Sequence, residues 1–191
     1  MIRFFPKDAE AQLVRKAKSG DTAAVKSIYD NNVRYLSAVC RRYVPDDDDL
    51  KDVLQEAFIK IFSTLYKFEY KGTGSLRGWM SRVVVNEALM FLRRSSKHPL
   101  LSLDDPLPDI PETEDPDVDG IPPQVLQSMV EELPPGCRTV LNLFVFEQKS
   151  HKEIAEMLGI RENSSTSQFH RAKTLLAGMI KQYRNEQGLD R

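Results

Sequence analysis

An all-α protein with two small helical domains, joined by an acidic and proline-rich linker, is the fold class that the sequence predicts. Apolar residues recur at three- and four-residue spacings along most of the chain, and the alternation typical of a half-buried strand does not persist in any segment. Seven of the 11 prolines lie within residues 99–123. The net charge is +6 in residues 1–97, −8 in residues 98–121 and +1 in residues 122–191. These three segments are the expected first domain, flexible linker and second domain.

The first domain is expected to contain four helices. Gly20 is the stop of the first helix, Asp21 is the cap of the second, and Pro45 ends the second. The acidic run that starts at Asp46 complements the dipole of the third helix, and Ser75 is the cap of the fourth. The expected helices cover residues 8–18, 21–43, 46–66 and 75–95. Their apolar faces include Ala24, Ile28, Tyr35, Leu36 and Val39 in the second helix, and Leu50, Val53, Leu54, Ala57, Phe58, Ile61, Phe62 and Leu65 in the third.

The second domain is also expected to contain four helices, over residues 122–132, 134–147, 150–158 and 164–183. Ser150 and Glu153 have the spacing of a capping box, and Gly159 is the expected stop of that short helix. A short helix, a tight turn and a polar-faced helix are typical of a helix-turn-helix. On its own this pattern also fits other helical hairpins.

The net charge of −1, taken for the whole chain, argues against a nucleic-acid-binding protein, because such proteins usually carry excess positive charge. Division by segment changes this interpretation. The basic first domain and the acidic linker cancel each other in the total, so the first domain keeps the charge that binding to DNA requires.

Metal, cofactor and membrane sites are not expected. Cys40 and Cys137 lie far apart among apolar residues, so we interpret both as reduced core residues. The three histidines do not cluster, and no metal or other cofactor is predicted. No apolar run approaches the roughly 20 residues of a membrane span. Charged residues follow Pro6 at once, so we expect no signal peptide and a cytoplasmic protein without a stable membrane association of its own.

Three motifs stand in order along the chain. Residues 52–62 read Asp-Val-Leu-Gln-Glu-Ala-Phe-Ile-Lys-Ile-Phe. Residues 79–86 read Trp-Met-Ser-Arg-Val-Val-Val-Asn, and Arg-Arg follows at 93–94. Residues 153–160 read Glu-Ile-Ala-Glu-Met-Leu-Gly-Ile, and His-Arg-Ala-Lys follows at 170–173. In this order they resemble the polymerase-binding segment, the promoter-melting helix and the helix-turn-helix of the extracytoplasmic-function sigma factors, the small two-domain group of the bacterial sigma-70 family.

Two features depart from the family pattern. Met90 stands where the family often has Asp, four residues after Asn86. The second helix of the family's helix-turn-helix usually begins Gly-Thr-Val-Lys-Ser-Arg, whereas residues 163–168 read Asn-Ser-Ser-Thr-Ser-Gln. The promoter sequence that this chain reads therefore does not follow from the resemblance.

The resemblance implies a transcription initiation factor that binds core RNA polymerase, directs it to promoters and helps to melt the −10 region. It implies a sigma2-like domain in residues 1–97 and a sigma4-like, −35-binding domain in residues 122–191. The chain is not expected to be an enzyme, because the polymerase performs the chemistry. The implied partners are core RNA polymerase, through its β′ clamp helices and its β flap, promoter DNA, and an anti-sigma factor that would hold the protein inactive.

Three groups of binding residues follow from the resemblance and from side-chain chemistry. The group implied to bind the polymerase, whose polar members could otherwise be a solvated helix face, is Asp52, Gln55, Glu56, Phe58 and Lys60. Aromatic rings stack on unpaired bases, an amide bonds to base edges and cations bind phosphate. The group expected at the −10 element is Phe68, Tyr70, Lys71, Arg77, Trp79, Arg82, Asn86, Arg93 and Arg94. Packing inside the protein is the alternative for Phe68, Tyr70 and Trp79.

The third group is expected on the outward face of the last helix. Hydroxyl and amide side chains can read base edges in the major groove, while Arg and Lys hold phosphate. The expected −35-binding residues are Ser164, Thr166, Ser167, Gln168, His170, Arg171 and Lys173. A polar surface helix is the alternative for each of them.

Three other functions stay open from the sequence. A stand-alone helix-turn-helix regulator would need only residues 122–191, and it leaves the motif at residues 52–62 unexplained. A polymerase-binding adaptor or anti-sigma protein would bind without directing transcription. A nuclease would have to hold Mg²⁺ with the acids at 46–49 and Asp52, which a dipole-compatible helix start explains more simply.

Overall fold

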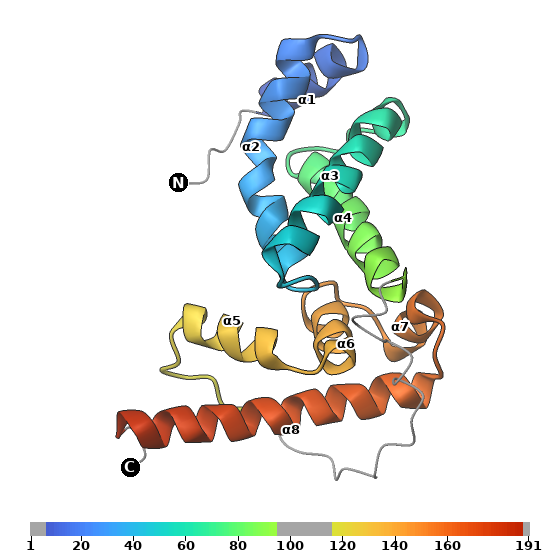
Figure 1. The fold of residues 1–191 in the computed structure, drawn as a ribbon. Coiled ribbons are helices and arrows are strands. Elements are labelled where there is room, and N and C mark those ends of the chain that lie inside the picture. Colours follow the sequence, from blue (N-terminus) through green and yellow to red (C-terminus); the bar gives the residue numbers. More distant parts are fainter. Residues whose placement is uncertain (1–6, 95–115, 189–191) are drawn as a thin grey trace. The chain divides into compact units, whose positions relative to one another are not determined.

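The computed structural model describes residues 7–94 and 116–188. All regular secondary structure in these residues is helical (Figure 1). No strand occurs among these residues, and the predicted all-α fold class is confirmed. The chain divides into two compact units, residues 1–91 and 92–191. Residue 97, the predicted end of the first domain, lies outside the described residues. Within the described ranges no helix is long and apolar enough to cross a bilayer.

The first unit contains the four predicted helices. They are α1 (Lys7–Lys18), α2 (Thr22–Arg41), α3 (Asp47–Thr64) and α4 (Ser75–Arg94), whose last residues pass the boundary between the units. The third predicted helix changes after Thr64 into a 3₁₀ turn, η1 (Leu65–Lys67). Such tighter turns are common at helix ends, which is why the periodicity of the sequence did not distinguish it.

Aspartate side chains begin α2 and α3 as predicted. Asp21 caps α2, and the carboxylate of Asp46 accepts hydrogen bonds from two backbone N–H groups in the first turn of α3, at 3.1 and 3.0 Å. Asp47 forms an ion pair with Arg41 at 2.6 Å. The acidic run therefore serves the start of a helix and a surface ion pair, which is the simpler of the two interpretations given above.

The core of the first unit includes the predicted apolar faces of α2 and α3, with Ile28, Leu36 and Ile61 fully buried, and apolar residues of α1 and α4. Tyr35 was expected in this core but is 42% exposed. Its ring instead lies under the guanidinium of Arg77, 4.9 Å from the ring centroid. A tyrosine can keep its hydroxyl in water while its ring contacts a cation, and for this reason an apolar stripe overpredicts its burial.

The second unit holds the other four predicted helices, α5 (Pro123–Glu132), α6 (Pro135–Val145), α7 (His151–Leu158) and α8 (Glu162–Gln187). α5 and α6 both begin with proline, whose missing N–H group would have no partner in a first turn. α8 packs along α6 and α7. The core between α5, α6 and α8 consists of Met129, Val130, Leu133, Cys137, Leu141, Ala172, Leu176 and Ile180, with Ile121.

Both cysteines are buried and reduced, as predicted. Burial disfavours a thiolate, so it raises the pKa of Cys40 to about 12 and that of Cys137 to about 11. Each is a small core residue rather than a reactive thiol.

The predicted flexible linker is shorter at its C-terminal end than the sequence suggested. Ile121 is only 8% exposed and belongs to the core of the second unit. The guanidinium of Arg184, in α8, donates hydrogen bonds to the carboxylate of Asp117 at 2.8 Å and to the carbonyl of Asp119 at 3.0 Å. Residues 117–121 therefore pack against α8, held by the burial of Ile121 and by the hydrogen bonds of Arg184. Residues 98–115 of the predicted linker lie outside the described residues.

Candidate functional site

The outward side of α3 carries three of the residues predicted to bind the polymerase. Asp52, Gln55 and Glu56 are exposed, while Val53 and Ala57 are buried on the other side of the helix. Residues three and four positions apart are neighbours on a helix surface, so the three polar side chains form one continuous patch. We call Asp52, Gln55 and Glu56 the α3 patch.

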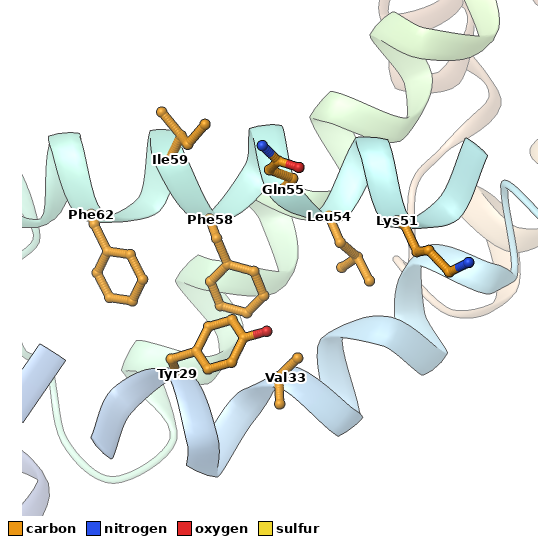
Figure 2. Close-up of a pocket in the computed structure, with 8 residues that line it drawn as sticks. All are labelled: Tyr29, Val33, Lys51, Leu54, Gln55, Phe58, Ile59 and Phe62. Atoms are coloured by element: carbon orange, nitrogen blue, oxygen red, sulfur yellow. The ribbon is translucent and has the colours of Figure 1, made fainter. Parts of the chain in front are cut away.

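An apolar groove lies between α2 and α3, beside the α3 patch (Figure 2). Its volume is about 620 Å³, and its lining is Tyr29, Val33, Lys51, Leu54, Gln55, Phe58, Ile59 and Phe62. Figure 2 shows Tyr29 and Val33 of α2 facing the side chains of α3. Ile59 is 56% exposed and Tyr29 41%, so apolar surface remains uncovered here. This groove was not predicted from the sequence, although Tyr29 and Val33 are four residues apart and Ile59 interrupts the polar side of its helix.

Two residues of the predicted polymerase-binding group have partners inside the first unit. Phe58 is 7% exposed, and its ring lies 4.6 Å from that of Tyr29, so it forms the floor of the groove rather than an exposed surface. Lys60 forms an ion pair with Glu87 of α4 at 2.5 Å. Its ammonium therefore links α3 to α4, which the sequence spacing of 27 residues could not show.

The loop of residues 68–74 connects η1 to α4 and contains three of the residues predicted to read the −10 element. Phe68 is buried, and its ring lies 5.1 Å from the ring of Trp79 in α4. Packing inside the protein, the alternative given for both rings, is what the structure shows for Phe68. Tyr70 is half-buried and Lys71 is exposed, so only these two of the three remain reachable for a ligand.

Both ends of this loop are also bound by α1, a helix for which the sequence predicted no function. The ammonium of Lys18 donates a hydrogen bond to the backbone carbonyl of Phe68 at 2.5 Å. The carboxylate of Glu10 accepts one from the backbone N–H of Gly74 at 3.0 Å. No local sequence signal could have found these contacts, because 50 and 64 residues separate the partners.

Along α4, Arg82, Asn86 and Arg93 are exposed on one side of the helix at spacings of four and seven residues. Arg94, at the end of the helix, is exposed as well. Arg77 differs from this group. Its guanidinium donates to the side-chain oxygen of Asn32 at 3.3 Å and covers Tyr35, so this predicted phosphate contact is used within the first unit.

The helix-turn-helix pattern predicted for residues 150–183 has the expected geometry. The hydroxyl of Ser150 accepts a hydrogen bond from the backbone N–H of Glu153 at 3.3 Å, and the Glu153 carboxylate accepts one from the backbone N–H of Ser150 at 2.9 Å. The second bond favours the charged carboxylate and lowers the pKa of Glu153 to about 2. Gly159 ends α7 in the left-handed conformation at φ +71°. The N-terminal turns of α8 therefore follow a short helix and a tight turn, as in a DNA-reading helix pair.

The predicted outward face of α8 is correct for five residues and wrong for two. Ser164, Thr166, Ser167, His170 and Arg171 are partly exposed. Gln168 is 4% exposed, and its side-chain oxygen accepts a hydrogen bond from the thiol of Cys137 at 2.9 Å. Lys173 is 8% exposed, and its ammonium lies 5.7 Å from the ring centroid of Phe169. Ser165, Gln168, Ala172 and Leu176 share the buried side, so in this structure neither Gln168 nor Lys173 faces outward to reach DNA.

An aromatic cluster joins α6, α7 and α8. The ring of His151 stacks on that of Phe144 at 4.8 Å, and its Nδ1 lies 2.9 Å from the hydroxyl of Ser165. Burial, with the nearby His170, lowers the pKa of His151. The neutral imidazole is thus part of the packing that sets α7 against α8.

Comparison with known proteins assigns both units. Residues 28–98 match the family model of sigma-70 region 2, and residues 124–176 match that of sigma-70 region 4. Together the two matches cover about two thirds of the chain. They follow the predicted order along the sequence, and the first of them has no place in a stand-alone helix-turn-helix regulator.

Curated relatives match over most of the chain. The ECF RNA polymerase sigma factor SigE of Mycolicibacterium smegmatis is 28% identical over 177 residues, which are 88% of this chain and 67% of the relative. SigM of Mycobacterium tuberculosis is 27% identical, over 90% of this chain and 85% of the relative. The ECF sigma-E factor of Escherichia coli K12 is 26% identical, over 88% and 92%.

A solved structure, that of CnrH in complex with the cytosolic domain of CnrY, aligns with 88% of this chain and 95% of its own at a TM-score of 0.46 and 20% identity. The assignment comes from the two region models and the curated relatives. The chain belongs to the extracytoplasmic-function group of the sigma-70 family, and it is a transcription initiation sigma factor whose family binds core RNA polymerase and promoter DNA.

Proposed function

We propose that the α3 patch and the neighbouring groove dock the protein on the β′ clamp helices of core polymerase. Asp52, Gln55 and Glu56 offer exposed hydrogen-bonding and charged groups, and Ile59 offers uncovered apolar surface next to them. An apolar centre with a polar rim is the usual composition of a specific interface. Lys60 is left out of this contact because Glu87 binds its ammonium.

The exposed side of α4, with Lys71 and Tyr70 of the preceding loop, is proposed to bind the unpaired −10 strand. The single observation that carries the proposal is the exposed row of Arg82, Asn86 and Arg93 on a helix whose other side is core. An amide can bond to the edge of an extruded base, while guanidinium groups on either side neutralise phosphates.

The start of α8 is proposed to read the −35 element. Its reading residues are the five that remain once Gln168 and Lys173, which face inward, are removed: Ser164, Thr166, Ser167, His170 and Arg171. Contact of the second unit with the β flap, and the existence of an anti-sigma factor, stay predictions.

Run-off transcription with purified core polymerase on genomic fragments tests the proposal. We expect Gln55→Ala with Glu56→Ala to weaken binding to core, so that transcript is lost at low protein concentration and regained near saturation. We expect Asn86→Ala to bind core like the unchanged protein and to lose most of its transcript even at saturation. Asn31→Ala, an exposed asparagine of α2, is the matched control. Failure of the unchanged protein to bind core and to give any promoter-specific transcript would overturn the proposal.

A further inference from the structure

The loop that precedes α4 has little regular structure of its own. Gly72 and Gly74 have φ values of +116° and +86°, a region that glycine occupies at no steric cost. Within the loop, the hydroxyl of Ser75 accepts a hydrogen bond from the N–H of Lys71 at 3.1 Å and donates one to the carbonyl of Gly72 at 2.6 Å. These bonds shape the turn where it enters α4, but they do not join it to another helix of the unit.

Helix α1 supplies that attachment at both ends of the loop. Lys18 binds the carbonyl of Phe68, where the loop begins, and Glu10 binds the N–H of Gly74, where it ends. Both bonds join a charged side chain to a backbone group, which makes them stronger than bonds between neutral groups. The carboxylate of Glu10 also lies at the start of α4, where the helix dipole favours a negative charge.

The sequence match to region 2 begins at residue 28, so α1 lies outside it. Two side chains of α1 nevertheless hold the backbone on which Tyr70 and Lys71 stand. A binding loop held before its ligand arrives has less conformational entropy to lose on binding.

We propose that Glu10 and Lys18 are positioning residues for promoter opening, which act by fixing the loop of residues 68–74 for the unpaired −10 strand. The inference rests on the function proposed above for this loop. It assigns to α1 a role in the DNA step and none in docking on the polymerase.

The test uses the full chain assembled with core polymerase and the promoter fragment that gives the strongest run-off transcript with the unchanged protein. Lys18→Met removes the donor and keeps the aliphatic side chain, and Lys18→Arg restores a donor. Lys16→Met is the matched control, because Lys16 is an exposed lysine of the same helix. At saturating protein, we expect Lys18→Met and Glu10→Ala each to lower the rate of open-complex formation by about three- to tenfold. Lys18→Arg is expected to recover most of the rate, and Lys16→Met to leave it unchanged.

Two further measurements separate positioning from a general loss of structure. Affinity for core polymerase is expected to be unchanged in all variants. Trp79, the only tryptophan of the chain, packs against Phe68, the first residue of the loop, and its fluorescence therefore reports on the loop. We expect greater acrylamide quenching of its fluorescence in Lys18→Met and Glu10→Ala, but not in Lys16→Met.

Open-complex rates equal to that of the unchanged protein in both Lys18→Met and Glu10→Ala would overturn the inference and leave the proposed function standing. A loss of affinity for core that matches the loss of rate would overturn it as well, since α1 would then act in docking. If the unchanged protein opened no promoter, the proposed function itself would fail.

Discussion

At the scale of single residues, His151 makes the second unit sensitive to acid. It is packed between Phe144 and Ser165, and His170 and Glu162 are the charged groups that act on its pKa. Its pKa is lowered from the usual 6.5, so below that pH the unfolded chain binds a proton that the folded chain does not. Stability is therefore fully present above about pH 6.5 and falls as the pH falls below it.

The variant His151→Gln tests this prediction. In urea denaturation followed by circular dichroism, we expect it to be less stable than the unchanged protein at pH 7.5 and to lose less stability between pH 7.5 and 5.5. Equal losses in the two proteins would show that another group carries the pH dependence.

Glu153 is also expected to lose its stabilising contribution in acid, but at a lower pH than His151. Its pKa is lowered from 4.5 to about 2, chiefly by the backbone N–H of Ser150, so its contribution is present above about pH 4.5 and is lost as the pH falls toward 2. We expect Glu153→Ala to lower the melting temperature at pH 7, and the difference from the unchanged protein to shrink at pH 3.5. Glu156→Ala, at an exposed glutamate of the same helix, is the control and should change little at either pH.

Burial of single polar residues is what the sequence predicted least well. Gln168 and Lys173 lie on the buried side of α8, where Gln168 is bound by Cys137 of α6 and Lys173 lies over Phe169 of α8 itself. A polar side chain looks the same in a sequence whether its partner is water, DNA or a buried thiol. Arg77 and Lys60 show the same limit, because their partners Asn32 and Glu87 lie on helices distant in the sequence.

At the scale of elements, the turn between α7 and α8 depends on one glycine. Gly159 has φ +71°, and a Cβ atom there would meet nothing within 4 Å, so substitution costs only backbone strain. We expect Gly159→Ala to reduce the free energy of unfolding by about 1 kcal/mol. Gly178, inside α8, also has open space around it but no positive φ. Gly178→Ala should therefore stabilise the protein by about 0.5–1 kcal/mol. Chemical denaturation measures the free energy of unfolding of both variants. A decrease of equal size in the two would contradict this explanation.

The helices themselves could be predicted because their signals are local. Asp21, Asp46 and the Ser150–Glu153 box mark helix starts, Gly159 marks an end, and apolar spacing identifies the buried sides. The groove between α2 and α3 could not be predicted in the same way. The groove forms where α2 and α3 pack together and leave Tyr29 and Ile59 partly exposed. How two helices pack is not determined by the local sequence of either helix.

At the scale of the whole molecule, the charge separation predicts a salt-dependent effect on DNA binding. Six of the acids in residues 98–121 lie before Pro116, at Asp104, Asp105, Asp109, Glu112, Glu114 and Asp115. Asp117 and Asp119 are left unchanged because Arg184 binds that segment. Replacing the six by Asn or Gln should raise the affinity of the free protein for duplex DNA by about three- to tenfold at low salt.

Fluorescence anisotropy with a labelled duplex measures this affinity at two salt concentrations. The gain should disappear at high salt, since screening removes the repulsion between the acids and the phosphates. An unchanged affinity at low salt would show that these acids do not weaken the binding of free protein to DNA.

The groove has a further consequence for the protein when it is alone in solution. Uncovered apolar surface drives proteins to associate with whatever can cover it, including copies of themselves. Ile59 and Tyr29 give the free chain such a surface. The chain is therefore expected to self-associate when its concentration exceeds that of its partner. A polymerase that covers the groove would act as a solubilising agent as well as a target, and the supply of polymerase would then set an upper limit on how much of this protein a cell can keep dispersed.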